Sequence, residues 1–253
     1  MPKVSVIIPT IKPEYASLMV NSVTANANYD DYEIVIVSPF ELEGDERVRW
    51  IREPEASSGA TTASIAGFER TDSEIVVGIG DYTLTKRNWL CNLVEFIEQR
   101  EKGAFPFCAG LFWANSNPET PPAVGTVFGH YYPYFYGMSR RSILAAGGYL
   151  LPEYPTAFGD CDLGLRVWEL GGQCQLCWDS ILISMWRKEM SAQRKANIGD
   201  HEGQMRTFID RWKPVYGEGW PAETLRDFNI DIPVSFIPFD DMSLLPTIIK
   251  PPN

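Results

Sequence analysis

Three aspartates stand where an α/β protein would place the side chains of a site. Asp81 follows the apolar run Ile75–Ile79, at the carboxyl end of a predicted strand, where open α/β sheets bind their ligands. Asp160 and Asp162 begin a predicted helix behind a loop rich in proline and aromatic residues. A carboxylate in such a place can accept a proton from a substrate or bind a divalent cation. Aspartate is also a favoured helix N-cap, so Asp162 could simply cap its helix. The residues alone predict an α/β ligand-binding domain with carboxylate-centred chemistry.

The sequence lacks the motifs of several other kinds of enzyme and binding site. Gly78-x-Gly80 lacks the third glycine of a dinucleotide fingerprint and lies inside a strand instead of opening a helix. There is no Walker lysine motif, no Gly-x-Ser-x-Gly elbow and no His-Glu-x-x-His pair. The two histidines, His130 and His201, have no motif around them. We interpret them as a loop residue among aromatics and a polar residue at a helix start.

Composition and charge narrow the class of protein. A length of 253 residues predicts one large domain, and a net charge of −11 argues against a nucleic-acid partner, because phosphate binding needs a basic surface. No apolar run approaches the ~20 residues of a membrane helix, and the N-terminus leads directly into a strand-like run, so we expect a cytoplasmic protein without a transmembrane segment. Five widely spread cysteines indicate reduced thiols. Cys174-x-x-Cys177 has no second pair to complete a zinc site.

Apolar runs bounded by proline, glycine and polar residues predict the elements that position the aspartates. Strands are predicted over residues 4–8, 33–37, 47–51 and 75–79. Helices are predicted over 14–27, from Gly59 behind a Ser57-Ser58 cap, from Trp89 behind an Asn88 cap, and over 160–171 and 199–212. This alternation indicates a mostly parallel sheet with helices on both faces.

Two regions fall outside this alternation. The aromatic-rich middle, 105–136, is predicted to be loop with short strands, and its aromatic cluster could hold a sugar or pack in the core. The proline-rich segment 231–253 is predicted to be an arm that follows a single domain over 1–230.

Several segments together carry a resemblance to a known family. They are, in chain order, 3–10, 57–67, 75–90, 137–149 and 159–166. The most specific are Gly147-Gly148-Tyr149 and Gly159-Asp-Cys-Asp-Leu-Gly-Leu-Arg166. In order and spacing they resemble the inverting family 2 of glycosyltransferases, which have the GT-A fold. The matching parts of that family are its opening strand, its helix motif, its metal-motif strand, its Gly-Gly-Phe turn and its Glu-Asp-x-Asp-Leu-x-Leu-Arg helix start.

The resemblance implies a hexosyltransferase that moves a sugar, with inversion, from a nucleotide-sugar donor to a hydroxyl of a glycan or lipid-linked acceptor. It implies Asp160 as the general base, and a divalent cation (Mn²⁺ or Mg²⁺) bound weakly or not at all through Asp81. The implied acceptor contacts are Gly148, Tyr149 and Asp162. The implied donor contacts are Pro9, Thr10, Glu14, Gly59, Gly80, Asp81 and Tyr82, of which Tyr82 could stack on a base or a sugar.

The sequence departs from this family at the positions of its acids. Ser38-Pro39-Phe40 stands where the family usually has Asp-Asp-Gly-Ser, and the Asp-x-Asp metal motif is reduced to Gly80-Asp81-Tyr82. Gly159 replaces the acid before Asp160. These losses leave open a second interpretation, a catalytically inactive GT-A-fold binding or scaffold protein. A third interpretation, a nucleotidyltransferase, ranks last, because the glycine-rich basic loop of that class is missing after the first strand.

Overall fold

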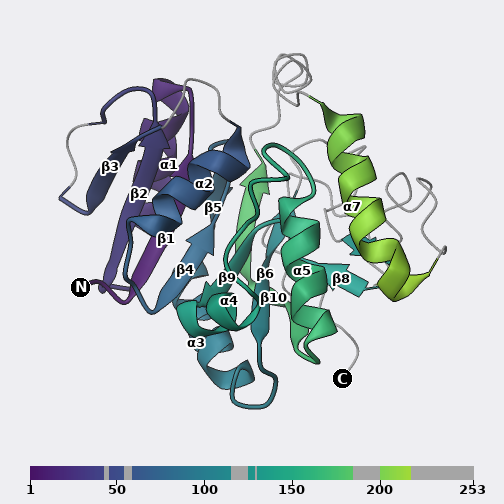
Figure 1. Ribbon diagram of the computed structural model, residues 1–253. Helices are drawn as coiled ribbons and strands as arrows, with labels where there is room; N and C mark the ends of the chain where they lie inside the picture. Colours follow the sequence, from purple (N-terminus) through teal and green to yellow (C-terminus); the bar gives the residue numbers. More distant parts are fainter. Residues whose placement is uncertain (43–45, 54–58, 115–124, 129, 185–199, 218–253) are drawn as a thin grey trace.

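The computed structural model describes residues 1–42, 46–53, 59–114, 125–128, 130–184 and 200–217 (Figure 1). The strands are β1 Val4–Pro9, β2 Tyr32–Ser38, β3 Val48–Arg52, β4 Ile75–Gly78, β5 Thr83–Thr85, β6 Phe107–Ala114, β7 Gly125–Val127, β8 His130–Tyr132, β9 Tyr136–Ser139 and β10 Gln173–Ser184. The helices are α1 Pro13–Asn26, α2 Ala60–Glu69, α3 Trp89–Arg100, α4 Arg140–Ala145, α5 Gly159–Glu169 and α7 His201–Tyr216. The predicted arm over 231–253 lies outside the described residues.

A mixed sheet of eight strands forms the centre of the protein, in the order β3-β2-β1-β4-β9-β6-β10-β5. β1 pairs in parallel with β2 and with β4, β2 pairs in parallel with β3, and β6 pairs in parallel with β10. β9 runs antiparallel between β4 and β6, and β5 runs antiparallel at the edge beside β10. The sheet is therefore mostly parallel, as predicted. A separate ribbon joins β7 to β8.

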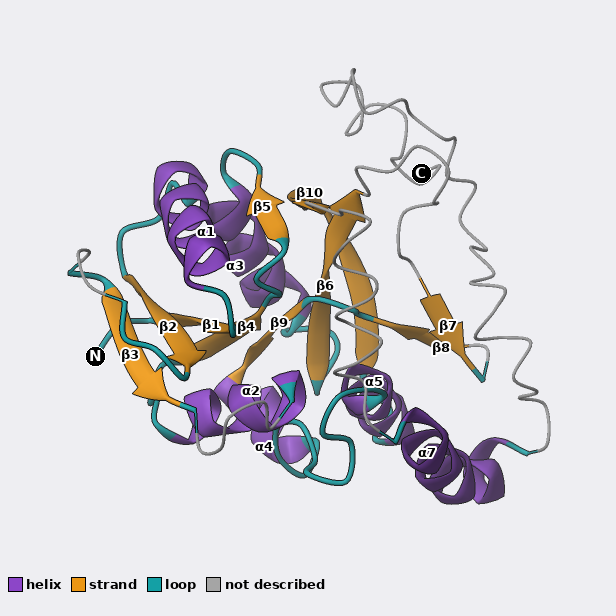
Figure 2. Ribbon diagram, turned by 90° about the horizontal axis from the view of Figure 1, so that it is seen from above, coloured by secondary structure: helices purple, strands orange, loops and turns teal. Residues whose placement is uncertain are grey.

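Helices cover both faces of this sheet, which confirms the predicted layers. Seen from above, α1 and α3 lie on one face, and α2, α4 and α5 lie on the other (Figure 2). The alternation along β1 explains the two cores: Val6 and Ile8 pack with α1 and α3, whereas Ile7 packs with α2. All three side chains are fully buried, and each such burial is worth ~1.5–3 kcal/mol.

The helix α7 lies beside α5, away from the sheet (Figures 1 and 2). A third apolar cluster joins the two helices, with Phe208 and Trp212 of α7 buried against Phe158 and Leu165 of the α5 region. Because α7 packs on α5 and not on the eight-stranded sheet, the two helices together form one end of the molecule.

The four predicted strands and the predicted helices are present, but the aromatic-rich middle differs from the prediction. Residues 105–136 contain β6, an eight-residue strand in the centre of the sheet, and β10 was not predicted at all. The run Phe107–Trp113 is continuously apolar because the strand is covered on both faces, so it lacks the alternation of a half-exposed strand.

Two predicted helix caps also need correction. Asn88 occupies the N-cap of α3, but its backbone is left-handed (φ 65°) and its side chain makes no capping hydrogen bond. The N-cap of α2 is Gly59, and Ser57 and Ser58 lie outside the described residues. In the part of the chain that the structure describes, no helix is both long enough and apolar enough to cross a bilayer.

Candidate functional site

A cavity of about 280 Å³ opens at the carboxyl ends of β1 and β4. Pro9 ends β1, and Gly78, Ile79 and Gly80 follow along the end of β4. From β1 the sheet continues through β2 to β3 on one side and to β4 on the other, so the cavity lies at the point where the strand order reverses. Open α/β sheets bind ligands at this point, because the loops on either side diverge and leave a crevice.

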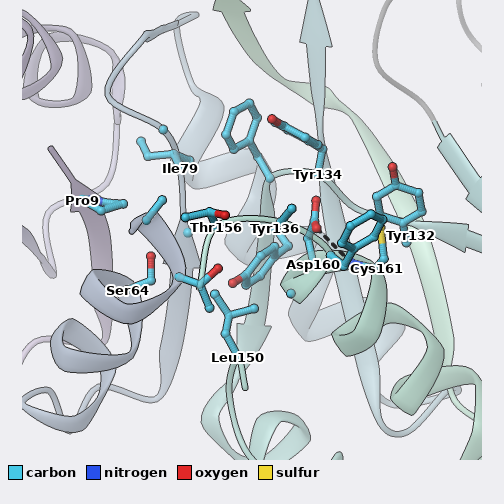
Figure 3. A pocket seen from close by; sticks show the side chains of 18 of the residues that line it. Pro9, Ser64, Ile79, Tyr132, Tyr134, Tyr136, Leu150, Thr156, Asp160 and Cys161 are labelled. Atoms are coloured by element: carbon cyan, nitrogen blue, oxygen red, sulfur yellow. Dashed lines mark hydrogen bonds between the residues drawn. The ribbon is translucent and has the colours of Figure 1, made fainter. Parts of the chain in front are cut away.

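The cavity wall is rich in aromatic rings and hydroxyl groups (Figure 3). Within the described residues that line it there is one carboxylate, Asp160, one imidazole, His201, and no lysine or arginine. The other lining residues are Pro9, Ala60, Thr61, Ser64, Gly78, Ile79, Gly80, Tyr82, Tyr132, Tyr134, Phe135, Tyr136, Leu150, Thr156, Ala157, Phe158, Gly159 and Cys161. This lining suits an uncharged polar ligand that has both C–H and hydroxyl groups.

Asp160 lies in the first turn of α5, and its carboxylate points into the cavity between Tyr134 and Tyr136 (Figure 3). Oδ1 accepts a hydrogen bond of 3.0 Å from the backbone N–H of Cys161. The partial positive charge at the helix N-terminus interacts favourably with a carboxylate at this place. Asp160 is therefore placed to accept a proton from a ligand in the cavity.

Two tyrosine hydroxyls lie beneath the cavity because residue 78 is a glycine. A Cβ on Gly78 would lie 3.1 Å from Oη of Tyr149 and 3.3 Å from Oη of Tyr136. Burial raises the pKa of both hydroxyls above the ordinary value of 10.0. Both phenols therefore stay protonated, and Tyr136, which lines the cavity, can donate a hydrogen bond to a ligand.

Two of the predicted acceptor contacts, Gly148 and Tyr149, do not line the cavity. Tyr149 does not line the cavity; its ring stacks on Phe68 with centroids 4.7 Å apart. The carbonyl oxygens of Gly148 and Tyr149 accept hydrogen bonds from the guanidinium of Arg166. These two residues hold the turn before α5 in place and do not contact the cavity.

The third predicted acceptor contact, Asp162, does not line the cavity either, because its carboxylate faces α7. The side chain is fully buried. Oδ2 accepts from Nε of Arg166 at 2.8 Å, and Oδ1 accepts from Nε1 of Trp212 at 3.0 Å and lies 3.2 Å from Nε of Arg211. We therefore assign Asp162 to the attachment of α7 and do not retain it as an acceptor contact.

This attachment of α7 shapes the cavity wall. Gln204 on α7 accepts hydrogen bonds of 3.0 Å from the backbone N–H groups of Thr156 and Ala157, both of which line the cavity. His201, the first residue of α7, lines the cavity as well, and its ring lies 5.1 Å from that of Phe158. No sequence motif surrounds His201, and only the packing of α7 brings it to the site.

The predicted donor contacts divide into two groups. Pro9, Gly80 and Tyr82 line the cavity, whereas Thr10, Glu14, Gly59 and Asp81 do not. Glu14 is exposed in the first turn of α1. Gly59 begins α2 against the loop before α5, where a Cβ would lie 2.3 Å from the carbonyl oxygen of Pro155.

Asp81 joins two strand ends instead of facing the cavity. Its Oδ2 accepts a hydrogen bond of 2.7 Å from Oγ1 of Thr10, which follows β1. Burial raises the pKa of Asp81 above its ordinary value of 3.8, and the hydrogen bond from Thr10 and the charge of Lys12 only partly offset this rise. The carboxylate thus connects the end of β4 to the end of β1.

The side chains at this place do not fit a resident divalent cation. A hard cation takes several oxygen ligands, and the part of the chain that the structure describes contains no cluster of three or more His, Cys, Asp or Glu side chains that could hold a metal. Of the three residues of the reduced motif, the two that line the cavity are Gly80 and Tyr82. The predicted role of Asp81 as a metal ligand therefore finds no support in this geometry.

Comparison with known proteins identifies the fold. No family model matches the sequence, and no curated protein matches it either. The structure, however, is similar to solved glycosyltransferases, and these likenesses establish a GT-A-type α/β fold.

Three solved structures illustrate the likeness. A mannosyltransferase, PcManGT from Pyrobaculum calidifontis, in complex with GDP-Man and Mn²⁺, has a TM-score of 0.60 and 15% identity over 85% of this chain and 68% of its own. TarS 1-349 of S. aureus in complex with UDP has a TM-score of 0.56 and 13% identity over 84% and 72%. GalNAc-T7 with UDP, GalNAc and Mn²⁺ has a TM-score of 0.56 and 16% identity over 75% and 44%. This chain thus spans less than half the length of GalNAc-T7, and at these identities the likeness concerns the fold alone.

Proposed function

We propose that this protein transfers a sugar, with inversion, from a nucleotide-sugar donor to a hydroxyl group of an acceptor. The observation that carries the proposal is the Asp160 carboxylate, which points into a cavity at the carboxyl ends of β1 and β4. The GT-A-type fold supports it, since the similar structures are glycosyltransferases whose complexes contain UDP or GDP-Man. A glycan or a lipid-linked sugar would supply the acceptor hydroxyl.

The proposed reaction is a single displacement in which Asp160 acts as the general base. The acceptor oxygen attacks the anomeric carbon of the sugar, and its proton passes to the Asp160 carboxylate. The bond between the anomeric carbon and the diphosphate oxygen breaks on the opposite face, and the electron pair leaves with the nucleoside diphosphate. A positioned base of this kind contributes roughly 10²–10⁴-fold to the rate.

The protein's own groups orient the sugar in this proposal. The Tyr136 hydroxyl, kept protonated by burial, donates to a sugar oxygen near Asp160. The loop of Thr156 and Ala157, fixed by Gln204, closes the cavity on the α7 side. Holding the two reactants in this geometry lowers the barrier by reducing the entropy that is lost in the transition state.

A second candidate is a saccharide-binding protein without transferase activity. The lining of the cavity beside β4 favours this candidate, because Gly80 and Tyr82 supply no carboxylate where the resemblance implies the acids of a metal motif. A fold of this class does not by itself confer activity. Transfer and binding must therefore be measured separately.

The test is Asp160→Asn, with Asp31→Asn, an exposed aspartate outside the cavity, as the matched control. Turnover is measured as release of nucleoside diphosphate from UDP-glucose, UDP-GalNAc and GDP-mannose in the presence of acceptor glycans, and donor binding is measured by calorimetry. We expect Asp160→Asn to lose roughly 10²–10⁴-fold in turnover with donor affinity and fold retained, and Asp31→Asn to behave as the wild type. Equal turnover in Asp160→Asn and the wild type would exclude Asp160 as the base.

A further inference from the structure

The segment of the cavity wall beside Gly80 consists of aromatic rings that pack against one another. Tyr82, Tyr134 and Phe135 line the cavity, and Trp113 of β6, which is 8% exposed, packs against all three rings. The rings of Trp113 and Tyr134 are parallel within 8°, with centroids 5.0 Å apart. Tyr82 meets Trp113 at 6.1 Å and Phe135 at 5.9 Å, and its hydroxyl donates to that of Tyr134 at 3.2 Å. We call Tyr82, Tyr134 and Phe135 the aromatic wall.

The aromatic wall occupies the space that a carboxylate at residue 80 would need. A Cβ on Gly80 would lie 2.8 Å from Cε1 of Tyr82 and 3.2 Å from Cε1 of Phe135. Asp81, the residue after Gly80, does not line the cavity, and its carboxylate is hydrogen-bonded to Thr10. The end of β4 therefore presents rings to the cavity where a cation subsite would present oxygen atoms.

The chemistry of the wall fits a sugar ring. The faces of aromatic rings carry negative charge density, and the C–H bonds on one face of a sugar are weakly positive, so the two stack in an apolar contact with an electrostatic component. The tyrosine hydroxyls and Asp160 surround this contact and can bond to the hydroxyl groups of the sugar. The cavity of about 280 Å³ is roughly twice the ~150 Å³ of a cavity that binds benzene, which is room for a ring with its substituents.

We infer that the aromatic wall is a stacking site for a sugar ring and that it has replaced a divalent-cation subsite, so that ligands bind this cavity without a metal ion. The inference rests on the proposed function for the identity of the larger ligand, a nucleotide sugar or a glycan acceptor. The inference goes further by naming the side chains that hold the sugar, and it predicts that binding does not depend on Mn²⁺ or Mg²⁺.

The experiment measures binding to the full chain by calorimetry. The probes are UDP-glucose, UDP-GalNAc, GDP-mannose and the free oligosaccharides of glucose and mannose, each with Mn²⁺, with Mg²⁺ and with EDTA. The variants are Tyr82→Ala, which removes the ring, and Tyr82→Phe, which keeps the ring and removes the hydroxyl bond to Tyr134. Phe105→Ala serves as the control, because Phe105 is exposed just before the start of β6, at the end of the strands opposite to the cavity.

The expected result is the same affinity with metal and with EDTA, a loss of roughly 3- to 10-fold in Tyr82→Ala, a smaller loss in Tyr82→Phe, which keeps the ring, and wild-type affinity in Phe105→Ala. Binding that requires Mn²⁺, or that is unchanged in Tyr82→Ala, overturns the inference. If oligosaccharides bind in the expected way and no nucleotide sugar binds, the proposed function fails and the inference stands. If a nucleotide sugar binds only with Mn²⁺, the proposed function stands and the inference fails. Absence of binding by every probe overturns both.

Discussion

Asp160 and Asp162 are two residues apart in one helical turn, but the loss of each carboxylate should affect a different property of the protein. Asp162→Ala removes the acceptor of a buried ion pair with Arg166 and of the Trp212 indole N–H. Asp160→Ala removes a carboxylate that points into the cavity. We expect the first change to cost stability and the second to cost function.

The magnitude follows from what each change leaves behind. Arg166 is 5% exposed, so Asp162→Ala leaves a buried guanidinium without its carboxylate, which typically costs about 3–5 kcal/mol. The contact with Arg211 adds little, because that side chain is 41% exposed. The expected loss is a large share of a typical unfolding free energy of about 5–15 kcal/mol. Asp160→Ala loses chiefly the favourable interaction with the helix N-terminus, worth about 0.3–1 kcal/mol.

The assay is equilibrium unfolding in urea, followed by the fluorescence of the eight tryptophans, one of which, Trp212, lies beside the altered site. Asp162→Asn is the milder companion, because its amide oxygen can still accept from Trp212 while the charge opposite Arg166 is lost; we expect a loss of about 1.5–3 kcal/mol. If Asp162→Ala costs no more than Asp160→Ala, then Asp162 does not anchor α7 as described.

Two further predictions concern the end of β4. The pKa of Asp81 is raised in the folded protein above its ordinary value of 3.8, so the native state holds this proton more tightly than the unfolded state, and stability should fall as the pH rises from about 4 through the raised pKa. Asp81→Asn, which still accepts from Thr10, should remove this decline and unfold at higher urea concentration than the wild type at neutral pH; a wild-type pH dependence in the variant would contradict this. Gly80→Ala should cost about 1–3 kcal/mol, because its Cβ would lie 2.8 Å from the Tyr82 ring, and it should cost less in a Tyr82→Ala background. Equal costs in the two backgrounds, measured by urea unfolding, would show that Tyr82 does not occupy that space.

Much of the sheet could be predicted from local patterns in the sequence. The apolar, β-branched run Val4–Ile8, which ends at a proline, predicts a strand without any knowledge of its neighbours in the sheet. The spacing of apolar residues from Trp89 to Ile97 identifies the buried face of α3. The strands that were not predicted are β6 and β10. The apolar run of β6 lies in a segment rich in aromatic, proline and glycine residues, and β10 is interrupted by Asp179 and Ser180, where its pairing with β6 shifts register. The sequence also predicts a candidate site at the carboxyl end of β4, because open α/β sheets bind their ligands there.

Which side chains face the cavity was decided only by the tertiary structure. Sequence spacing treats Asp81, Asp160 and Asp162 alike, yet Thr10 binds the first and Trp212 binds the third, across 71 and 50 residues of chain. The aromatic wall likewise joins the end of β4 to β6 and to the segment before β9. The periodicity of a helix or strand tells which face of that element is buried, but not which distant element packs on it. A carboxylate therefore becomes a candidate base or a structural anchor according to the neighbour that the fold brings to it.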